Sequence, residues 1–331
     1  MQFSRYLTGL MAGLLAGMLA LTAVPGHAQD YPTRPVTVIV PFAAGGPTDV
    51  IARIVADHMA RSLGQTFVIE NVVGAGGTTG VTRAKRARPD GYTIVMGHMG
   101  THAAAVALYP NLAYKPDVDF EAVGLVAEQP ELLAVRKDLP PTTLKEFAAY
   151  AKANESKLNM AHAGVGSVSY VGCLLLNAAI GIKPTMVPFT GTGPAMNALI
   201  AGQVDAMCDQ IVNAVPQIKG GTIKAYAIAT EERNPALPDL PTTKEAGLPE
   251  YQASAWNALF APKGTPKPVV DRLSDALSKA LDDPATRKRL LDLGSDIPGK
   301  EGRGGAPLAA LVKSEIAKWG PVIKAAGTTV N

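Results

Sequence analysis

The chain has 331 residues, 47% of them hydrophobic, and a formal net charge of +3 at pH 7. This composition is typical of a folded globular protein, and its Lys and Arg residues are scattered, which argues against a nucleic-acid or membrane-surface partner. The length exceeds what one hydrophobic core usually serves, so two lobes are expected.

Residues 1–28 have the features of a secretory signal peptide. Arg5 precedes an almost wholly apolar run over residues 7–24, and Pro25-Gly26-His27-Ala28 follows. This order predicts cleavage after Ala28 and a periplasmic mature protein that begins at Gln29. A retained membrane anchor is the alternative, because the run approaches the roughly 20 residues of a spanning helix. No later stretch is comparably apolar, so no membrane insertion of the mature chain is expected.

The first predicted unit is a strand, a glycine-rich turn and a helix. The β-branched run 36–40 predicts the strand, and apolar residues at helical spacing predict a helix with Thr48 as its N-cap and Gly64 at its end. A strand at 67–70, a loop at 71–80, a basic helix and a strand at 92–96 repeat this plan. Such alternation predicts an α/β fold with a parallel sheet, in which ligands collect beyond the carboxyl ends of the strands.

The middle of the chain repeats the pattern as a second lobe. Strands are predicted near 132–135, at 158–161 and around 186–187, and the loops 164–170 and 189–195 each lead into a helix. The chain from Val269 onward is predicted to be helical, with apolar stripes that pack on sheets. Each lobe therefore presents strand-to-helix loops rich in glycine.

Cys173 and Cys208 lie in a chain that is predicted to be exported, so they are expected to form a disulfide. Two separately buried thiols are the alternative. Either arrangement is structural, because the spacing of the two cysteines is not that of metal ligands.

The motifs of common enzymes and cofactor sites are missing. The sequence has no P-loop, and the run Gly74-Ala-Gly-Gly-Thr-Thr79 departs from the dinucleotide fingerprint at its last position. Ser167 lacks the flanking glycines of a nucleophile elbow, which favours a hydroxyl ligand or a helix cap. His98 and His102 have zinc-helix spacing but enclose Gly100 and lack the intervening Glu. No cofactor, no metal and no catalytic constellation are therefore expected.

The glycine-rich loops instead favour an anion site made from the main chain. Gly45 and Gly46 let the backbone approach a ligand closely, and the helix that follows adds the positive end of its dipole. Such a site needs few charged side chains.

In this order of motifs the chain resembles the Bug-type extracytoplasmic solute receptors of tripartite tricarboxylate transport systems. The first-lobe motif Pro-Phe/Tyr-x-x-Gly-Gly-x-x-Asp-x-x-Ala-Arg is matched over residues 41–53, and the second-lobe motif Gly-x-Gly-Ser is matched by Gly164, Gly166 and Ser167. Further matches are Gly74-Ala-Gly-Gly77, Pro89-Asp-Gly-Tyr-Thr93, Val187 to Ala195, Gly202-Gln-Val-Asp205, Leu237 to Thr242, Glu245-Ala-Gly247, Trp256 and Ala261 to Pro266.

The resemblance implies an α/β, type II periplasmic-binding-protein architecture. Its two lobes each have a central, mostly parallel sheet flanked by helices, two crossovers join them, the C-terminal helices return to the first lobe, and the ligand cleft lies between the lobes. Lobe 1 is expected at 29–128 and 254–331, and lobe 2 at 129–253. The implied function is capture of a small carboxylate, aliphatic di- or tricarboxylate or aromatic, by a monomeric receptor that closes around it and passes it to the membrane components of a tripartite tricarboxylate-type transporter. A sensor for a signalling partner and, less favoured, an exported hydrolase are the alternatives.

The expected ligand-binding residues come from the loops at the cleft. They are Phe42, Ala43, Ala44, Gly45, Gly46, Thr48, Asp49, Gly77, Thr78, His98, Thr101, Ala163, Gly164, Gly166, Ser167, Tyr170, Thr190, Gly191 and Asp209.

Tyr170 and Asp209 are the two expected site residues with the weakest basis. Tyr170 stands where many relatives have His, so it is either a phenol in the cleft, which would suit an aromatic carboxylate, or a buried residue of its helix. Asp209 is either an acceptor for a ligand hydroxyl or ammonium group, or a buried helix cap.

Overall fold

The computed structural model describes residues 31–325. The signal peptide predicted for residues 1–28 lies outside the described residues. Within the described residues, the chain from Arg34 to Ala325 forms one compact unit. None of the helices in the described part of the chain combines the length and the apolar character needed to cross a bilayer.

The elements from β1 to α4, which we call the first lobe, surround three parallel strands. Strand β1 pairs with β2 on one side and with β3 on the other, both in parallel. The elements are β1 (Val36–Val40), α2 (Pro47–Leu63), β2 (Phe67–Asn71), η2 (Ala75–Gly77), α3 (Thr78–Lys85), β3 (Thr93–His98), η3 (Gly100–Ala104) and α4 (Ala105–Leu108).

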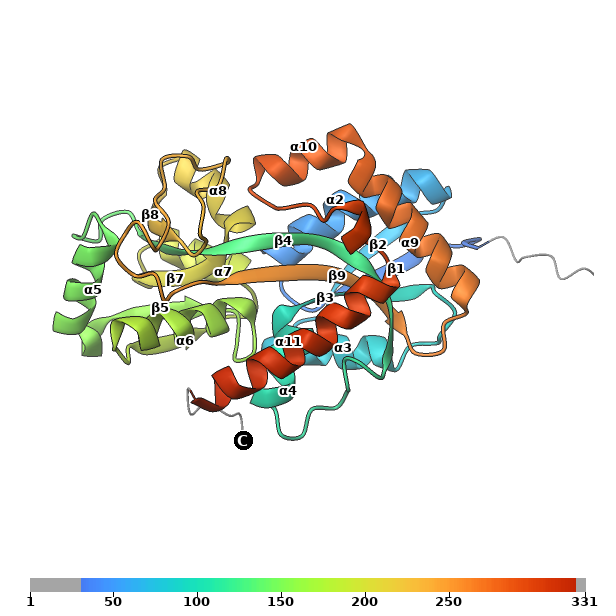
Figure 1. Ribbon diagram of the computed structural model, residues 1–331, viewed down its shortest axis with the longest axis horizontal. Coiled ribbons are helices and arrows are strands. Elements are labelled where there is room, and N and C mark those ends of the chain that lie inside the picture. The colour runs from blue at the N-terminus through green and yellow to red at the C-terminus, as the bar shows by residue number, and fades with distance from the viewer. Residues whose placement is uncertain (1–30, 326–331) are drawn as a thin grey trace, which may run out of the picture. The chain divides into compact units, whose positions relative to one another are not determined.

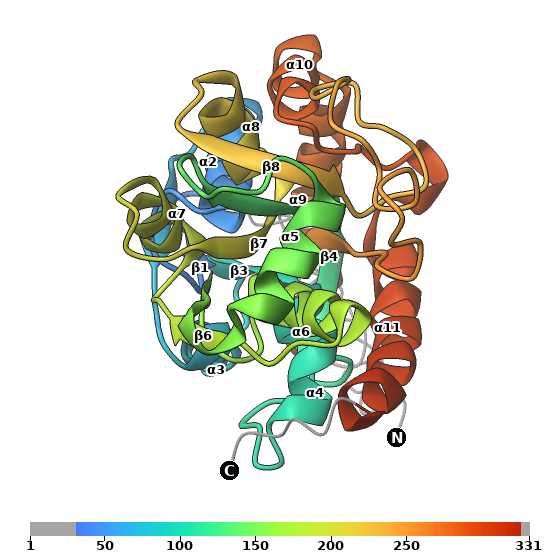
Figure 2. The ribbon, with the colours of Figure 1, turned by 90° about the vertical axis from the view of Figure 1, so that its left-hand side faces the viewer.

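The elements from α5 to β8, the second lobe, repeat this arrangement around β5, which pairs in parallel with β6 and β7. Helix α8 lies on one side of β7 and β8, and α5 and α6 lie on the other (Figures 1 and 2). The elements are α5 (Leu144–Ala153), η4 (Glu155–Lys157), β5 (Asn159–His162), α6 (Val168–Ile180), β6 (Thr185–Pro188), α7 (Thr192–Ile200), β7 (Ala206–Gln210), α8 (Ile211–Lys219) and β8 (Ile223–Ile228).

Two long strands, β4 (Phe120–Arg136) and β9 (Ser254–Pro262), run side by side between the lobes (Figure 1). They pair with each other, β9 pairs with β3, and β4 pairs with β7 and β8, all antiparallel. The fold is therefore α/β with a mixed sheet, parallel within each lobe and antiparallel at the crossing. The sequence pattern predicted only the parallel part, because the crossing strands are paired over a long separation in the chain.

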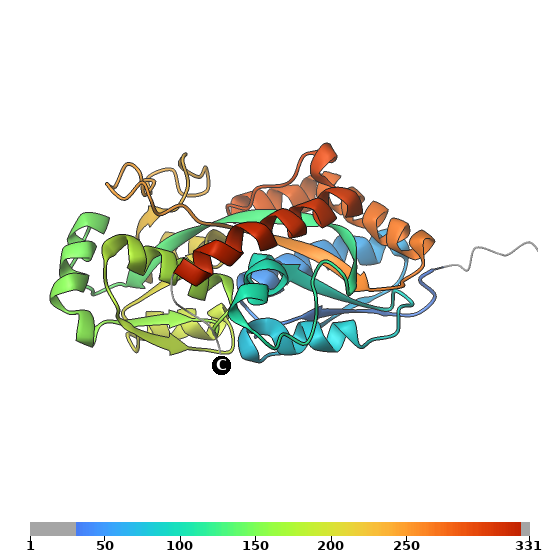
Figure 3. The ribbon, with the colours of Figure 1, turned by 60° about the horizontal axis from the view of Figure 1, so that its bottom comes forward.

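The C-terminal helices α9 (Lys267–Asp282), α10 (Pro284–Asp292) and α11 (Gly305–Ala325), with η5 (Lys300–Gly302), follow the crossing. Helix α9 packs on α2, and α11 lies over β4 and β9 (Figure 3). The indole nitrogens of Trp256 in β9 and Trp319 in α11 both donate to Glu315 Oε2, at 3.3 and 2.9 Å. This shared acceptor attaches the last helix to a crossing strand.

Helix α2 begins earlier in the chain than the sequence pattern predicted. Its N-cap is Gly46 and Pro47 occupies the first turn, so the prediction of Thr48 as N-cap is wrong. Proline suits the first helical position because it has no N–H to leave unpaired and its φ angle is already helical. Gly64 ends the helix in a left-handed conformation, with φ of 69°, as predicted.

Candidate functional site

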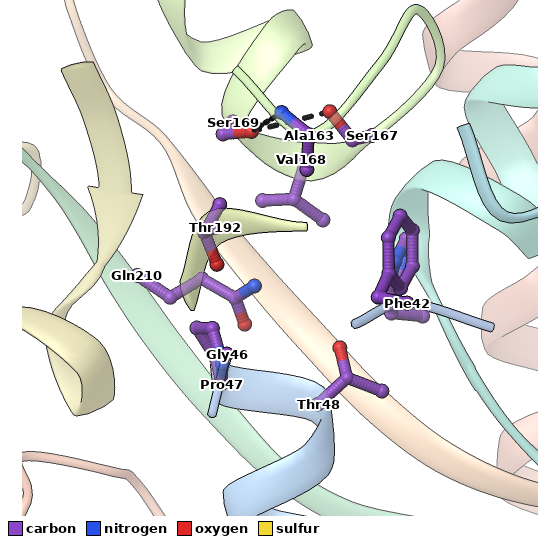
Figure 4. A pocket seen from close by; sticks show the side chains of 11 residues that line it. Phe42, Gly46, Pro47, Thr48, Ala163, Ser167, Val168, Ser169, Thr192 and Gln210 are labelled. Atoms are coloured by element: carbon purple, nitrogen blue, oxygen red, sulfur yellow. Dashed lines mark hydrogen bonds between the residues drawn. The ribbon is translucent and has the colours of Figure 1, made fainter. Parts of the chain in front are cut away.

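The starts of four helices meet at one small cavity between the lobes. Each of α2, α6, α7 and α8 contributes its N-cap residue or a first-turn residue to the lining (Figure 4). The first N–H groups of a helix have no partner inside it, and they carry the positive end of the helix dipole. The lining residues are Phe42, Gly46, Pro47, Thr48, His98, Ala163, Ser167, Val168, Ser169, Thr192 and Gln210.

The first-lobe wall of the cavity is largely aromatic. The rings of Phe42 and His98 are stacked, with centroids 5.0 Å apart and planes 20° apart. The Thr101 backbone N–H donates to Nδ1 of His98 at 3.2 Å. Burial lowers the pKa of His98 to about 3, so this imidazole is neutral and carries its proton on Nε2. Thr101 therefore positions the ring from behind and does not line the cavity.

The second-lobe wall is polar, and its serine hydroxyls serve the loop itself. Ser167 Oγ donates to the Gly164 carbonyl at 2.7 Å and accepts the Tyr170 N–H at 3.2 Å, which caps α6. Ser169 Oγ lies 3.1 Å from Ser167 Oγ and accepts the Ala163 N–H at 3.0 Å. The sequence left Ser167 as either a hydroxyl ligand or a helix cap, and in the structure its side chain caps α6. What this wall offers a ligand is the backbone N–H groups at the start of α6.

None of the described residues that line the cavity is a Lys or an Arg. Arg53 donates instead to both oxygens of Asp49 at 2.9 Å, and Asp49 also accepts the Gly45 N–H. Burial alone raises the pKa of Asp49, but hydrogen bonds from Arg53, Gly45 and Asn71 outweigh it and lower that pKa. Asp49 thus holds the Gly45 turn in place from beneath. Within residues 31–325 no group of three His, Cys, Asp or Glu side chains is placed to hold a metal ion.

Asp209 lies behind the cavity wall. It is fully buried, accepts the Gln210 N–H at 2.8 Å and accepts from Asn213 Nδ2 at 2.5 Å. Burial raises the pKa of Asp209 to about 7, against the lowering effect of these hydrogen bonds. Asp209 is therefore a buried residue of β7 whose carboxylate contacts the start of α8, and it is not the cap of that helix, because the N-cap is Gln210.

Tyr170 is also outside the lining. Its side chain is 7% exposed, and its ring lies 4.9 Å from that of His162 among the core residues. The sequence left Tyr170 as either a phenol in the cleft or a buried residue of its helix, and in the structure it is a buried residue of α6.

A second groove, of ≈ 630 Å³, opens beside the cavity where loops of the two lobes touch. The Tyr109 hydroxyl lies 3.0 Å from the Ala75 carbonyl of the first lobe and 2.5 Å from the Val165 carbonyl of the second. On another loop pair, the Ala43 N–H donates to the Thr190 carbonyl at 3.1 Å. The groove is lined by Gly74, Ala75, Gly76, Gly77, Tyr109, Ala163, Gly164, Val165, Pro188, Phe189 and Thr190.

The loops meet so closely that only glycine fits at several positions. A Cβ on Gly76 would lie 1.8 Å from the Val165 carbonyl oxygen, and one on Gly193 would lie 2.7 Å from the Ala44 carbonyl oxygen. The cavity volume is ≈ 20 Å³, which is room for one or two waters. The lobes are thus in a closed arrangement, and a ligand of several carbon atoms requires the loops to separate.

The prediction of a disulfide between Cys173 and Cys208 is wrong for this structure, which has two free, buried thiols. Cys173 lies in α6 and Cys208 in β7, and the Cys208 backbone N–H donates to Cys173 Sγ at 3.2 Å. The two side chains are neighbours in a hydrophobic cluster that also contains Tyr251. The thiol of Cys173 therefore serves as an acceptor for the strand.

The expected ligand-binding residues fall into three groups. Phe42, Gly46, Thr48, His98, Ala163 and Ser167 line the cavity, and Gly77, Gly164 and Thr190 line the adjoining groove. Residues outside both linings are Ala43, Ala44, Gly45, Asp49, Thr78, Thr101, Gly166, Tyr170, Gly191 and Asp209.

Sequence reasoning missed Pro47, Val168, Ser169, Thr192 and Gln210 in the cavity lining. All five are N-cap or first-turn residues of α2, α6, α7 or α8. The rule that ligands collect where strands of an α/β sheet end and helices begin would have found them.

Comparison with known proteins gives one consistent result. The model of the tripartite tricarboxylate transporter family receptors matches residues 51–328. A UPF0065 protein from the TAR-I ttuE-ttuC' intergenic region of Agrobacterium vitis is 45% identical, with 95% of this chain and 91% of that protein covered.

Two solved structures are similar over most of the chain. MatC from Rhodopseudomonas palustris with bound malate is 56% identical with a TM-score of 0.86, covering 88% of this chain and 100% of MatC. The periplasmic binding protein BugD is 44% identical with a TM-score of 0.88, covering 90% of this chain and 99% of BugD.

Proposed function

Because this chain belongs to the family of tripartite tricarboxylate transporter receptors, we propose that it captures a small carboxylate in the cavity between its lobes and performs no chemistry on it. The observation that carries this proposal is the meeting of four helix starts at a cavity with no basic side chain. Free N–H groups and dipoles bind an anion without a fixed positive charge.

The affinity that such a site reaches is adequate for a receptor. A hydrogen bond to an ionised group is worth about 1.5–3 kcal/mol. Three or four of them, less the cost of closing the lobes, reach the roughly 8 kcal/mol of micromolar binding. The Ser167 hydroxyl is engaged within its own loop, where it contacts the Gly164 carbonyl, Ser169 and the Tyr170 N–H.

The ligand class that we propose for the site, once its loops separate, is a short aliphatic dicarboxylate. MatC, at 56% identity, was solved with malate, a four-carbon dicarboxylate. Phe42 and His98 give one flat apolar wall, whereas the Tyr170 ring packs against His162 in the core and adds no second aromatic surface to the cavity.

A thermal-shift screen tests the proposal. The mature chain is refolded from denaturant to remove bound ligand and is then mixed with mono-, di- and tricarboxylates, amino acids and sugars. A ligand at 100 times its Kd adds about 2.7 kcal/mol of stability, which raises the Tm by several degrees. Shifts with carboxylates alone support the proposal, and shifts only with amino acids or sugars contradict it.

We also propose that the protein is exported, is cleaved after Ala28 and acts as a periplasmic monomer that docks on the membrane subunits of a tripartite tricarboxylate-type transporter. A hinged receptor that closes and docks needs no second copy of itself. N-terminal sequencing of the exported protein should begin at Gln29, and its mass in solution should be that of one mature chain. An intact N-terminus in the membrane fraction would indicate a retained anchor.

A further inference from the structure

Three buried amide side chains form a row from the cavity to the crossing strands. Gln210 ends β7, Gln129 lies in β4 and Asn257 lies in β9, and the sheet places these strands side by side in the order β9-β4-β7. Gln129 and Asn257 are fully buried, and Gln210 is 4% exposed. Of the three, Gln210 alone lines the cavity, where its amide extends toward the space between Thr192 and Thr48 (Figure 4).

Hydrogen bonds within the row set which end of the Gln210 amide faces the cavity. Asn257 Nδ2 donates to Gln210 Oε1 at 3.1 Å and also to Gln129 Oε1. The carbonyl end of Gln210 is therefore held by β9, and its Nε2 hydrogens remain for a group in the cavity. Turning this amide alone would oppose two N–H donors, Nε2 of Gln210 and Nδ2 of Asn257, so it turns only if Asn257 turns as well.

The row contains buried atoms that no other described residue satisfies. Gln129 Nε2 and Asn257 Oδ1 have no hydrogen-bond partner among residues 31–325. Buried amides left half-satisfied cost stability, so a buried polar row of this kind needs an explanation. The row ends at the cavity, where the Nε2 group of Gln210 is available as a donor.

We infer that Gln210 is a specificity-determining residue that donates to a second acceptor group on the ligand, the distal carboxylate of a short dicarboxylate, and that Asn257 is the positioning residue that keeps the donor end of this amide toward the ligand. This inference rests on the proposed function, because the helix starts hold the first carboxylate. The pair then selects dicarboxylates over monocarboxylates of equal length.

The test compares succinate and malate with butyrate by calorimetric titration of the refolded mature chain. Gln210→Leu, which keeps the size and removes the donor, should weaken dicarboxylate binding by roughly 10- to 150-fold and leave butyrate binding within a few fold. Gln210→Glu should weaken dicarboxylate binding further by repulsion. Gln203→Glu, the same charge change at an exposed turn, should bind like the wild type.

Asn257→Asp tests the positioning role by a readout that loss of packing would not move. The carboxylate that Asn257→Asp introduces accepts and does not donate, so the Gln210 amide should turn its carbonyl to the cavity. The ratio of dicarboxylate to butyrate affinity should then fall although Gln210 is present. Melting curves without ligand show whether each variant folds. If Asn257→Asp does not fold, the Gln210 variants alone decide the inference.

Two outcomes separate the inference from the proposed function. An unchanged ratio of dicarboxylate to butyrate affinity in Gln210→Leu overturns the inference, whereas dicarboxylate binding by the wild type still upholds the proposed function. Failure of the wild type to bind any carboxylate overturns both.

Discussion

The two walls of the cavity are built from the same local unit, a strand that leads through a short turn into a helix, yet they offer a ligand different chemistry. The first-lobe wall has the stacked rings of Phe42 and His98 beside the start of α2, which has no side-chain cap. The second-lobe wall has the starts of α6, α7 and α8 and the amide of Gln210. Under the proposed function, the first lobe would shape and cover the ligand, whereas the second would supply most of the hydrogen-bond donors.

The two walls act together only if the lobes close, and Gly76 is where closure is tightest. Gly76→Ala should weaken ligand binding by roughly 5- to 150-fold, because its Cβ would lie 1.8 Å from the Val165 carbonyl oxygen and overpacking costs about 1–3 kcal/mol. Calorimetric titration measures the change. Gly64→Ala is the matched control, since Gly64 also has positive φ but nothing within 4 Å. Equal losses in both variants would mean that backbone strain and not closure is responsible.

The donor role of the second lobe depends on the order of its loop at α6. Ser167→Ala should lower the free energy of unfolding by about 1 kcal/mol, because Ser167 caps the helix, and it should weaken binding a few fold. Thr143→Ala removes a comparable cap, at α5, and should lower stability equally without changing affinity. Urea denaturation and titration measure the two quantities. An unchanged affinity in Ser167→Ala would remove α6 from the binding wall.

Asp209 adds a dependence of binding on pH. Burial raises its pKa to about 7, so the native carboxyl is neutral at pH 6 and mostly charged at pH 8, where it repels an anion. A raised pKa also means that the stability from this group is present below about pH 4 and is lost as the pH rises through 7. The affinity for a fully ionised dicarboxylate should therefore be several-fold higher at pH 6 than at pH 8.

The ionisable groups around the cavity make this pH range informative. The pKa values of His98 and His162 are lowered by burial to about 3 and about 4, so neither titrates between pH 6 and 8. Asp209→Asn should remove the dependence, and Asp275→Asn, at an exposed position of α9, should retain it. Calorimetric titration of each variant with the dicarboxylate at pH 6 and at pH 8 measures the dependence. A slope that persists in Asp209→Asn would assign it to another group.

The family, the α/β class and the alternation of strands with glycine-rich loops were predicted from the sequence and are confirmed. These features depend on short-range patterns, such as the β-branched run of β1 and the left-handed Gly64 that ends α2. The details of the helix starts were less accessible. Thr48 looked like an N-cap, but Pro47 moved the start of α2 to Gly46, because proline fits the first helical turn.

By itself the sequence determined the order in which strands, glycine-rich loops and helices follow one another, because hydrophobic periodicity, glycine and proline act within a few residues of the chain. Only the tertiary structure decided which of two neighbours, Asp209 or Gln210, faces the cavity, because adjacent residues of β7 point to opposite sides of the sheet. It also decided that Gln210 meets Asn257, and that Gly76 meets Val165. Such contacts join residues far apart in the chain, and they exist only once both crossing strands and both lobes are in place.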